Sequence, residues 1–397
     1  MSTHKIGFVL TGGFKKLAPH VGALYRYKEE EDAGKIARPE FVIGASAGAI
    51  AVVSCFSPWH YKNIQVVGDL VRRLTKDQIF SYHFWMESAG ILTVAEDFVL
   101  PFFPKGSTVK RRALFEIFKS GLSLGTKALL AYELLEKQSI FSNRPLYNLL
   151  KKNLKPEFFW KAGTPGPNCV KLEIPAVNLA TAQEWIFTNY LPEHRNLAKR
   201  DEYLIKAVMA SASVPVCFPP EKIDSYLLDD AALKINAPLH RAVLADCDTI
   251  FVFLHSQDFT ETVPLPKKWT EDLNRELDIA INESTRKTIE GHQDTNQNLK
   301  TAEESEGLLQ EAEGLLEKEK NAGELRIILL QLKEKMKNYT FYGRKKTNLI
   351  LVVANEKIPN LYIADFNQEQ LTESIAIGYR AMDKALKDFH QKNNQTN

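Results

Sequence analysis

The chain has 397 residues and nearly balanced charge, with 51 lysines and arginines against 49 aspartates and glutamates. This length is too great for one small core, and it suits either two or three domains or one α/β enzyme domain with insertions. Because there is no large basic excess, the composition gives no indication of a nucleic-acid partner.

The cysteines and the N-terminal residues indicate the cellular compartment that we expect for this protein. The four cysteines are far apart and form no C-x-x-C pair, which argues against a structural zinc site and a disulfide framework. Residues 1–5 lead directly into an apolar segment, so we expect no cleavable signal peptide. No apolar run reaches the length of a membrane span. We therefore expect a cytoplasmic protein whose contact with a membrane is peripheral and transient.

The first strand and helix enclose a glycine turn. Lys5–Leu10 is a short apolar stretch that predicts a buried strand, and residues 19–31 have the apolar spacing of a helix. Between them lies the loop Gly12-Gly13-Phe14-Lys15-Lys16-Leu17. A strand, a glycine turn and a helix in this order point backbone N–H groups at an anion.

A second junction of this kind contains a serine. Phe41–Gly44 predicts the end of a buried strand, and Ala49–Phe56 predicts the start of a buried helix. The pattern Gly44-x-Ser46-x-Gly48 lies between them, and small residues are needed where a strand turns sharply into a helix. This context indicates a nucleophile elbow, in which the serine Oγ is presented to a substrate. The alternative is a small-residue turn that only packs a helix on a sheet.

The next region, residues 78–155, is expected to be a helical insertion. It contains an apolar run broken by prolines at 97–104 and a basic amphipathic pattern that begins at Lys110. We expect the segment from about Phe98 to Leu135 to cover the serine and to control access from a membrane. The alternative is a static insertion that packs on the sheet. A helix is also predicted just before this region, over 62–76.

The second half of the chain returns to the sheet. Strands are predicted at 171–177 and 184–188, and a helix at 201–211. A proline-containing stretch follows at 210–220, and then a segment at 226–238 that contains consecutive aspartates.

The last third contains the least regular pattern. A buried strand is predicted at 249–254, and residues 267–340 form a polar helical arm with a near repeat of seven residues at 306–319. Residues 285–340 are either a solvated structural arm or a site for a protein partner. A strand at 348–353 and a helix through 371–386 complete the chain.

Taken together, these motifs resemble the patatin-like phospholipases, a family of lipid acyl hydrolases with a Ser–Asp dyad. The loop after the first strand, the G-x-S-x-G elbow after the second and the stretch Ala210–Pro220 all have counterparts in that family. The segment from Asp230 to Pro238 is similar to the family motif D-G-G-V-x-x-N-x-P, and Asp230, Asn236 and Pro238 keep their places in it. The resemblance covers about residues 5–388, apart from the arm.

The resemblance implies a single catalytic domain over 1–397, with a three-layer α/β/α fold, a central mostly parallel sheet and helical insertions. It implies a nucleophile and a base, an oxyanion loop, and motif residues that support them. The implied catalytic residues are Ser46 and Asp230; the oxyanion or substrate-binding residues are Gly12, Gly13, Phe14, Lys16 and Ala47; the motif residues are Gly44, Gly48 and Asn236.

The implied activity is hydrolysis of fatty-acyl esters of phospholipids or other membrane glycerolipids through an acyl-enzyme on Ser46. The aspartate acts as the base only if it is partly desolvated, because desolvation raises its basicity. We expect no metal or other cofactor, and no ligand cluster is visible in the sequence. Among the nine histidines, only His255 at the end of a strand suits a catalytic triad, which is the competing interpretation.

At four positions this sequence has a larger residue where the family pattern has glycine. Two are in the oxyanion loop and two follow the aspartate: Phe14, Leu17, Ala231 and Ala232. A residue with a Cβ adopts a positive φ at greater cost than glycine, so we expect an oxyanion hole that is less open or that forms only when lipid binds. The alternative function is therefore a weakly active or inactive lipid-binding or scaffold protein with the same fold.

Overall fold

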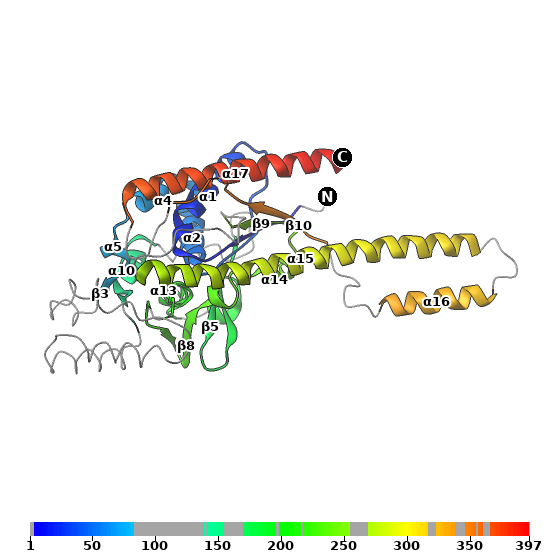
Figure 1. Ribbon diagram of the computed structural model, residues 1–397, viewed down its shortest axis with the longest axis horizontal. Helices are drawn as coiled ribbons and strands as arrows, with labels where there is room; N and C mark the ends of the chain where they lie inside the picture. The colour runs from blue at the N-terminus through cyan, green and yellow to red at the C-terminus, as the bar shows by residue number, and fades with distance from the viewer. Residues whose placement is uncertain are drawn as a thin grey trace.

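The computed structural model describes residues 4–82, 139, 141–154, 170–195, 198–215, 217–254, 269–316, 323–337, 346–354, 356–359 and 366–396. Two parts can be distinguished in Figure 1, a layered body and a long helical arm that extends from it. The predicted cover at 98–135 and the candidate base His255 lie outside the described residues.

The centre of the body is an eight-stranded sheet with the order β10-β9-β1-β2-β5-β8-β7, in which β6 also pairs with β5. Its parallel strands are β10 (Asn348–Val352), β9 (Thr249–Phe253), β1 (Ile6–Leu10), β2 (Phe41–Gly44) and β5 (Lys171–Asn178). Its antiparallel strands are β6 (Gln183–Thr188), β7 (Glu221–Ile223) and β8 (Tyr226–Asp230). Leu10 and Gly44 are in register, so the loops that follow β1 and β2 begin at the same edge.

Both faces of the parallel strands are buried, because alternate side chains enter two different cores. Phe8 and Phe251 belong to the larger core, whereas their neighbours Val9 and Val252 belong to the smaller one. This burial on both faces explains why β1 and β2 are apolar throughout. The sheet is therefore the middle of three layers, which confirms the predicted α/β/α fold.

The larger core is formed with helices α1 (Leu17–Asp32), α2 (Ala47–Phe56), α4 (Ile64–Arg72), α13 (Arg200–Ser211) and α17 (Gln368–Thr396). The smaller core is formed with α14 (Leu239–Leu244) and the first half of α15 (Trp269–Leu316). The remaining elements are η1 (Phe14–Lys16), α3 (Pro58–Lys62), α5 (Lys76–Ile79), β3 (Ser81–Tyr82), β4 (Phe141–Ser142), α10 (Arg144–Asn153), α12 (Pro192–Arg195), η2 (Ala231–Leu233) and α16 (Gly323–Lys337).

One predicted helix is wrong in its bounds. The single helix expected over 62–76 is α4 alone, since the backbone of Asn63 before it is not helical and α4 ends at Arg72. Thr75 then starts a new helix, α5, through a capping box in which Gln78 accepts a hydrogen bond from the Thr75 N–H. Reciprocal capping of this kind separates two helices that apolar spacing alone would join.

Two glycines allow α1 and α17 to cross at short distance. A Cβ placed on Gly22 of α1 would lie 1.9 Å from the Ile375 carbonyl oxygen, and one placed on Gly378 of α17 would lie 2.0 Å from the Pro19 carbonyl oxygen. At this crossing the backbone of α1 therefore lies directly against the backbone of α17. The contact ties the last described helix to α1, the helix that follows the glycine turn after β1.

No helix in the described ranges is both long and apolar enough to cross a bilayer.

We predict that Gly378→Ala destabilises the protein by roughly 1–3 kcal/mol, because the added methyl must push apart two backbones that do not yield. Urea unfolding measures this change. The matched control is Gly291→Ala on α15, where a Cβ meets no atom within 4 Å. There the better helix propensity of alanine should stabilise the protein by about 0.5–1 kcal/mol. Equal effects of the two substitutions would contradict the crossing described above.

Candidate active site

The turn between β2 and α2 holds Ser46 in a strained conformation. Ser46 has φ 54° and ψ −120°, which a residue with a side chain rarely adopts. A Cβ on Gly44 would lie 2.3 Å from the Gly48 carbonyl oxygen, and a Cβ on Gly48 would lie 2.3 Å from the Leu10 carbonyl oxygen. Glycine is therefore required on both sides of the serine, and the turn is a nucleophile elbow in its geometry.

Asp230 lies at the end of β8 and is buried, with 4% of its surface exposed. Its Oδ1 accepts a hydrogen bond of 2.7 Å from the Ala232 N–H. Its Oδ2 is buried and makes no hydrogen bond of normal geometry within the described residues. Burial raises the pKa of Asp230 to about 7, although the nearby Ser46 hydroxyl and the Ala232 N–H lower it. With a pKa near 7, the carboxylate can accept a proton at neutral pH, and its Oδ2 is available for that proton.

The adjacent Asp229 is a less suitable base. Successive side chains of a strand point to opposite faces, so Asp229 of β8 faces away from Asp230. Its Oδ1 accepts a hydrogen bond of 3.0 Å from the Asp230 N–H, and burial raises its pKa to about 6. Its negative charge also contributes to the raised pKa of Asp230.

The end of α13 contacts both candidate catalytic residues. The Ser46 N–H donates a 3.0 Å hydrogen bond to Ser211 Oγ, and the Asp230 N–H donates one of 3.2 Å to the Ser213 carbonyl. Ser211 and Ser213 were not predicted as site residues, although they belong to the stretch 210–220 that resembles the family. Their hydrogen bonds fix the distance between the elbow and β8.

Three backbone N–H groups beside Ser46 are available to an oxyanion. They belong to Gly13, Phe14 and Ala47, and all three residues line the same cavity as Ser46. None of the three N–H groups donates a hydrogen bond to another described residue. Gly13 has φ 117°, so this turn of the loop requires glycine. The Ala47 N–H is also the first of α2, where the helix favours negative charge.

Gly12 has a different role from the one predicted. Its N–H is not available to an oxyanion, because it donates a buried hydrogen bond of 2.5 Å to Asn236 Oδ1. Its lack of a side chain is what matters, since a Cβ there would lie 2.8 Å from the Cβ of Ser46, the Cβ of Ala232 and Asn236 Oδ1. Gly12 thus allows the loop, the elbow and the segment after Asp230 to meet.

The bulky replacements do not strain the loop as expected. Phe14 and Leu17 have negative φ, because the chain enters the 3₁₀ turn η1 directly after Gly13. The Phe14 ring packs on Phe366, with 5.4 Å between ring centroids, and lines the cavity. Ala231 and Ala232 are buried in the turn η2 and likewise have no positive φ. The less open oxyanion hole was predicted on the assumption that these residues need a positive φ, and none of them has one.

Lys16 lies beneath the loop and not among the residues that line the cavity. Its ammonium is buried and donates a 3.2 Å hydrogen bond to Thr11 Oγ1, which in turn donates one of 2.7 Å to the Phe253 carbonyl. His20 Nε2 donates to the Thr11 carbonyl at 2.8 Å. These bonds hold the loop to the ends of β1 and β9, so the geometry gives Lys16 a positioning role.

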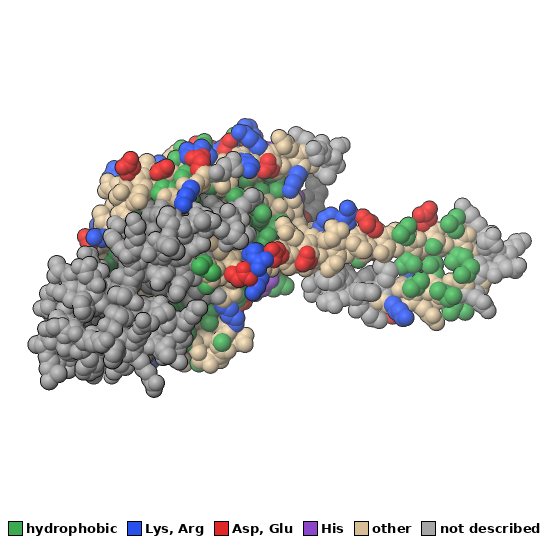
Figure 2. Space-filling model, in the orientation of Figure 1, with side chains coloured by type: hydrophobic (Ala, Val, Ile, Leu, Met, Phe, Trp, Pro, Cys, Tyr) green, Lys and Arg blue, Asp and Glu red, His purple; other side chains and the backbone are tan. Residues whose placement is uncertain are grey.

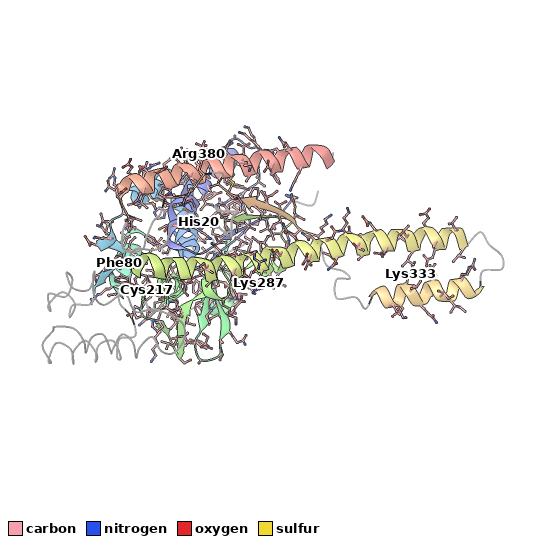
Figure 3. All side chains as sticks on the ribbon, viewed as in Figure 1. His20, Phe80, Cys217, Lys287, Lys333 and Arg380 are labelled. Atoms are coloured by element: carbon pink, nitrogen blue, oxygen red, sulfur yellow. The ribbon has the colours of Figure 1, made fainter. Side chains whose placement is uncertain are left out.

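The described histidines offer no base to Ser46. Burial lowers the pKa of His20 to about 3, so its imidazole stays neutral, and its Nε2 is engaged by Thr11. His60 lines the cavity, but its Nδ1 is bonded to Ser57 Oγ at 2.8 Å. Figure 3 shows His20 on its helix within the body. In the described residues, no three His, Cys, Asp or Glu side chains are placed to hold a metal ion.

A buried chain of hydrogen bonds joins the oxyanion loop to α15. Asn236 accepts from Gly12 through Oδ1 and donates through Nδ2 to Thr285 Oγ1 at 2.6 Å. The Thr285 hydroxyl donates to the Ile281 carbonyl at 2.8 Å, and the Ile281 side chain lines the cavity. Both Asn236 and Thr285 are at most 1% exposed. Thr285 could not be predicted as a site residue, because its partner is 49 residues away in the chain.

Ser46 opens into an apolar cavity of about 300 Å³. Its walls come from η1, α1, α2, α3, α4, α5, α10, the segment after α13 and α15, and most of the side chains are apolar. The polar residues in the lining include Arg73 and Gln78, which are exposed, and Asn153, which is partly exposed. A cavity of this volume and polarity suits an apolar chain whose reactive group reaches Ser46. The arrangement as a whole can transfer an acyl group to a serine.

The sequence matches the family model described as patatin-like phospholipase over residues 8–243, which is more than half of the chain. Among solved structures, the chain is similar to VipD from Legionella pneumophila, with 14% sequence identity and a TM-score of 0.38. That alignment covers 97% of this chain and 67% of VipD. No curated protein matches the sequence.

We predict that Thr285→Val slows acylation of Ser46 by about tenfold, because the buried Asn236 amide loses its acceptor and holds Gly12 less firmly. Stopped-flow kinetics with an activated ester would measure kcat and KM separately. Thr285→Ser keeps the hydroxyl and should restore kcat. A Val variant that unfolds more easily but keeps the kcat of the wild type would contradict a positioning role and leave a structural one.

Proposed function

Because the chain belongs to the patatin-like phospholipase family, we propose that it is a serine acyl hydrolase that cleaves fatty-acyl esters of membrane glycerolipids. The single observation that carries this proposal is a buried Ser46–Asp230 pair beside an apolar cavity of about 300 Å³. The cavity provides the surface that a fatty-acyl chain needs, and the pair provides a nucleophile with a base.

In the first half of the proposed reaction, Ser46 Oγ attacks the ester carbonyl and Asp230 takes the serine proton. The negative charge that develops on the carbonyl oxygen is stabilised by the N–H groups of Gly13, Phe14 and Ala47. Because these groups are fixed before the substrate binds, little reorganisation is needed when the charge forms. The tetrahedral intermediate then expels the glycerolipid alcohol, which takes the proton from Asp230, and the acyl group stays on Ser46.

In the second half, a water molecule attacks the acyl-enzyme while Asp230 accepts its proton. The carboxyl group returns that proton to Ser46 as the fatty acid leaves. One residue with a pKa near 7 can serve in both halves, since it is able to accept and release a proton at neutral pH. The raised pKa caused by burial is therefore the property that lets an aspartate replace the usual histidine.

Retention of the complete geometry favours an enzyme over an inactive scaffold. The elbow is strained, the carboxylate is desolvated and the N–H groups beside them have no other acceptor in the described residues. Each of these features costs stability, and a scaffold would gain nothing from them.

We predict that Ser46→Ala and Asp230→Asn each lower kcat for hydrolysis of phosphatidylcholine vesicles by at least about a thousandfold. The two changes should not add in the double variant, since both side chains take part in one proton transfer. Released fatty acid is the measured product, and urea unfolding shows whether each variant is folded. If Asp230→Asn keeps near-normal turnover, another group is the base.

We also predict a rising pH profile. Asp230 acts as a base only when ionised, so kcat/KM should increase with pH and reach half its maximum near pH 7. The negative charge of Asp229 raises this pKa, so Asp229→Asn should move the midpoint to lower pH while keeping the acceptor for the Asp230 N–H. A profile that is flat between pH 5 and 8 would contradict the assignment of the base.

A further inference from the structure

The arm consists of two antiparallel helices that stand away from the body. α15 begins beside the active site and continues beyond the body, and α16 folds back along its distal part (Figure 1). The ammonium of Lys333 forms an ion pair with Glu313, and the guanidinium of Arg326 donates a 2.8 Å hydrogen bond to the Leu316 carbonyl. These two contacts fix the register of the hairpin. Lys287 and Lys333 are labelled in Figure 3, on the part of α15 at the body and on α16.

α16 is apolar on nearly all sides of its central turns, which is the pattern of a buried helix. Its residues Ile327–Leu330 are followed by Gln331 and Leu332, with no charge among them. Of these, Leu329 is buried, at 8% exposure, and the other apolar residues are between 46% and 61% exposed. One neighbouring helix, α15, is therefore not enough to cover α16.

Five of the exposed apolar residues lie on one side of the hairpin, across both helices, and we call this surface the apolar face. Leu308 and Leu315 are seven residues apart on α15, and Leu325, Ile328 and Leu332 are spaced by three and four residues on α16. Their exposed fractions are 67%, 61%, 58%, 51% and 46%. Figure 2 shows apolar side chains of the two helices gathered on the side of the arm that faces the viewer.

The charges at this end of the molecule argue against a lipid surface as the cover. Over residues 300–316, α15 carries five glutamates and one lysine. Helices that lie on membranes instead carry an excess of lysine and arginine on their polar side. α16 has the opposite balance, with four basic residues and two glutamates over 323–337. Each hairpin thus has one acidic and one basic helix beside the same apolar face.

We propose that the apolar face binds the apolar face of a second copy of this chain, so that two hairpins form a four-helix bundle. A two-fold axis parallel to the arm places α15 of each copy over α16 of the other, which brings the acidic helix against the basic one. Every helix then has antiparallel neighbours, as in up-and-down bundles built from two hairpins. The opposite docking, α15 over α15, would place glutamates against glutamates.

The register of the hairpin identifies one pair between the copies. Because Glu313 pairs with Lys333, Glu311 and Lys335 lie at the same level of the arm. Glu311 is three residues from Leu308 and four from Leu315, and Lys335 is three residues from Leu332, so both flank the apolar face. Neither side chain has an ion pair within the described residues. In the proposed bundle, Glu311 of one copy faces Lys335 of the other.

Sedimentation equilibrium of the full chain tests the proposal directly. The wild type should dimerise, and Leu308→Glu should raise the dimer dissociation constant at least about thirtyfold, because it buries an unpaired charge. The control Gln310→Glu adds the same charge two residues along the same helix, on the opposite side, and should leave the dissociation constant unchanged. Circular dichroism verifies that both variants keep the helical content of the wild type.

A charge exchange then tests the orientation of the two copies. Glu311→Lys and Lys335→Glu should each weaken the dimer, and the double variant should recover most of the lost affinity. If the double variant loses as much dimerisation free energy as the two single variants together, the α15-over-α16 arrangement is wrong. A wild type that stays monomeric at every concentration would overturn the proposal, and if Leu308→Glu then abolished flotation with phosphatidylcholine vesicles, the face would be assigned to lipid.

Discussion

The strained turn at Ser46 is the constraint on which the rest of the body depends. A positive φ at a serine is unfavourable, and it persists only where the surrounding backbone leaves no alternative. Here the carbonyl of Leu10 at the end of β1 lies against Gly48, and Gly12 lies against the serine Cβ. The parallel register of β1 and β2 therefore also sets how the loop Gly12–Leu17 lies against the turn at Ser46.

The second constraint is the burial of Asp230. An ionisable carboxyl group with 4% exposure destabilises the folded protein whenever it is charged, and the Ala232 N–H offsets only part of that cost. The same desolvation raises the pKa of the carboxyl group to about 7. Asn236 joins the two halves of the site, because it follows Asp230 closely in the chain and binds the loop that precedes Ser46. Its bond to Thr285 extends this connection to α15, so the helix that carries the arm is also part of the support of the active site.

What the sequence could predict was local. The strands Phe41–Gly44 and Asn348–Val352, the elbow and the order of the motifs follow from apolar periodicity and from glycine spacing over a few residues. The break between α4 and α5 was missed because a capping box at Thr75 competes with continuous apolar spacing. The roles of Gly12 and Thr285 could not be predicted, since each depends on a hydrogen bond to Asn236, which is far away in the chain.

The larger residues at glycine positions of the family pattern also show that sequence alone does not reveal backbone conformation. Replacement of glycine by Phe14 indicated strain only as long as a positive φ was assumed at that position, and the structure places the positive φ at Gly13 instead. A motif specifies residue types, but backbone conformation decides what each replacement costs. The side chain of Phe14 packs on Phe366, so the substitution contributes to the wall of the cavity.

The central claim is that Ser46 is a nucleophile activated by Asp230. Intact-protein mass spectrometry after exposure to an alkyl fluorophosphonate tests it most directly, because the reagent forms a stable bond only with an activated serine. The account predicts one adduct on the wild type, localised to Ser46 by peptide mapping, with none on Ser46→Ala and strongly slowed labelling of Asp230→Asn. Labelling of another residue, or equal rates for the wild type and Asp230→Asn, would contradict it.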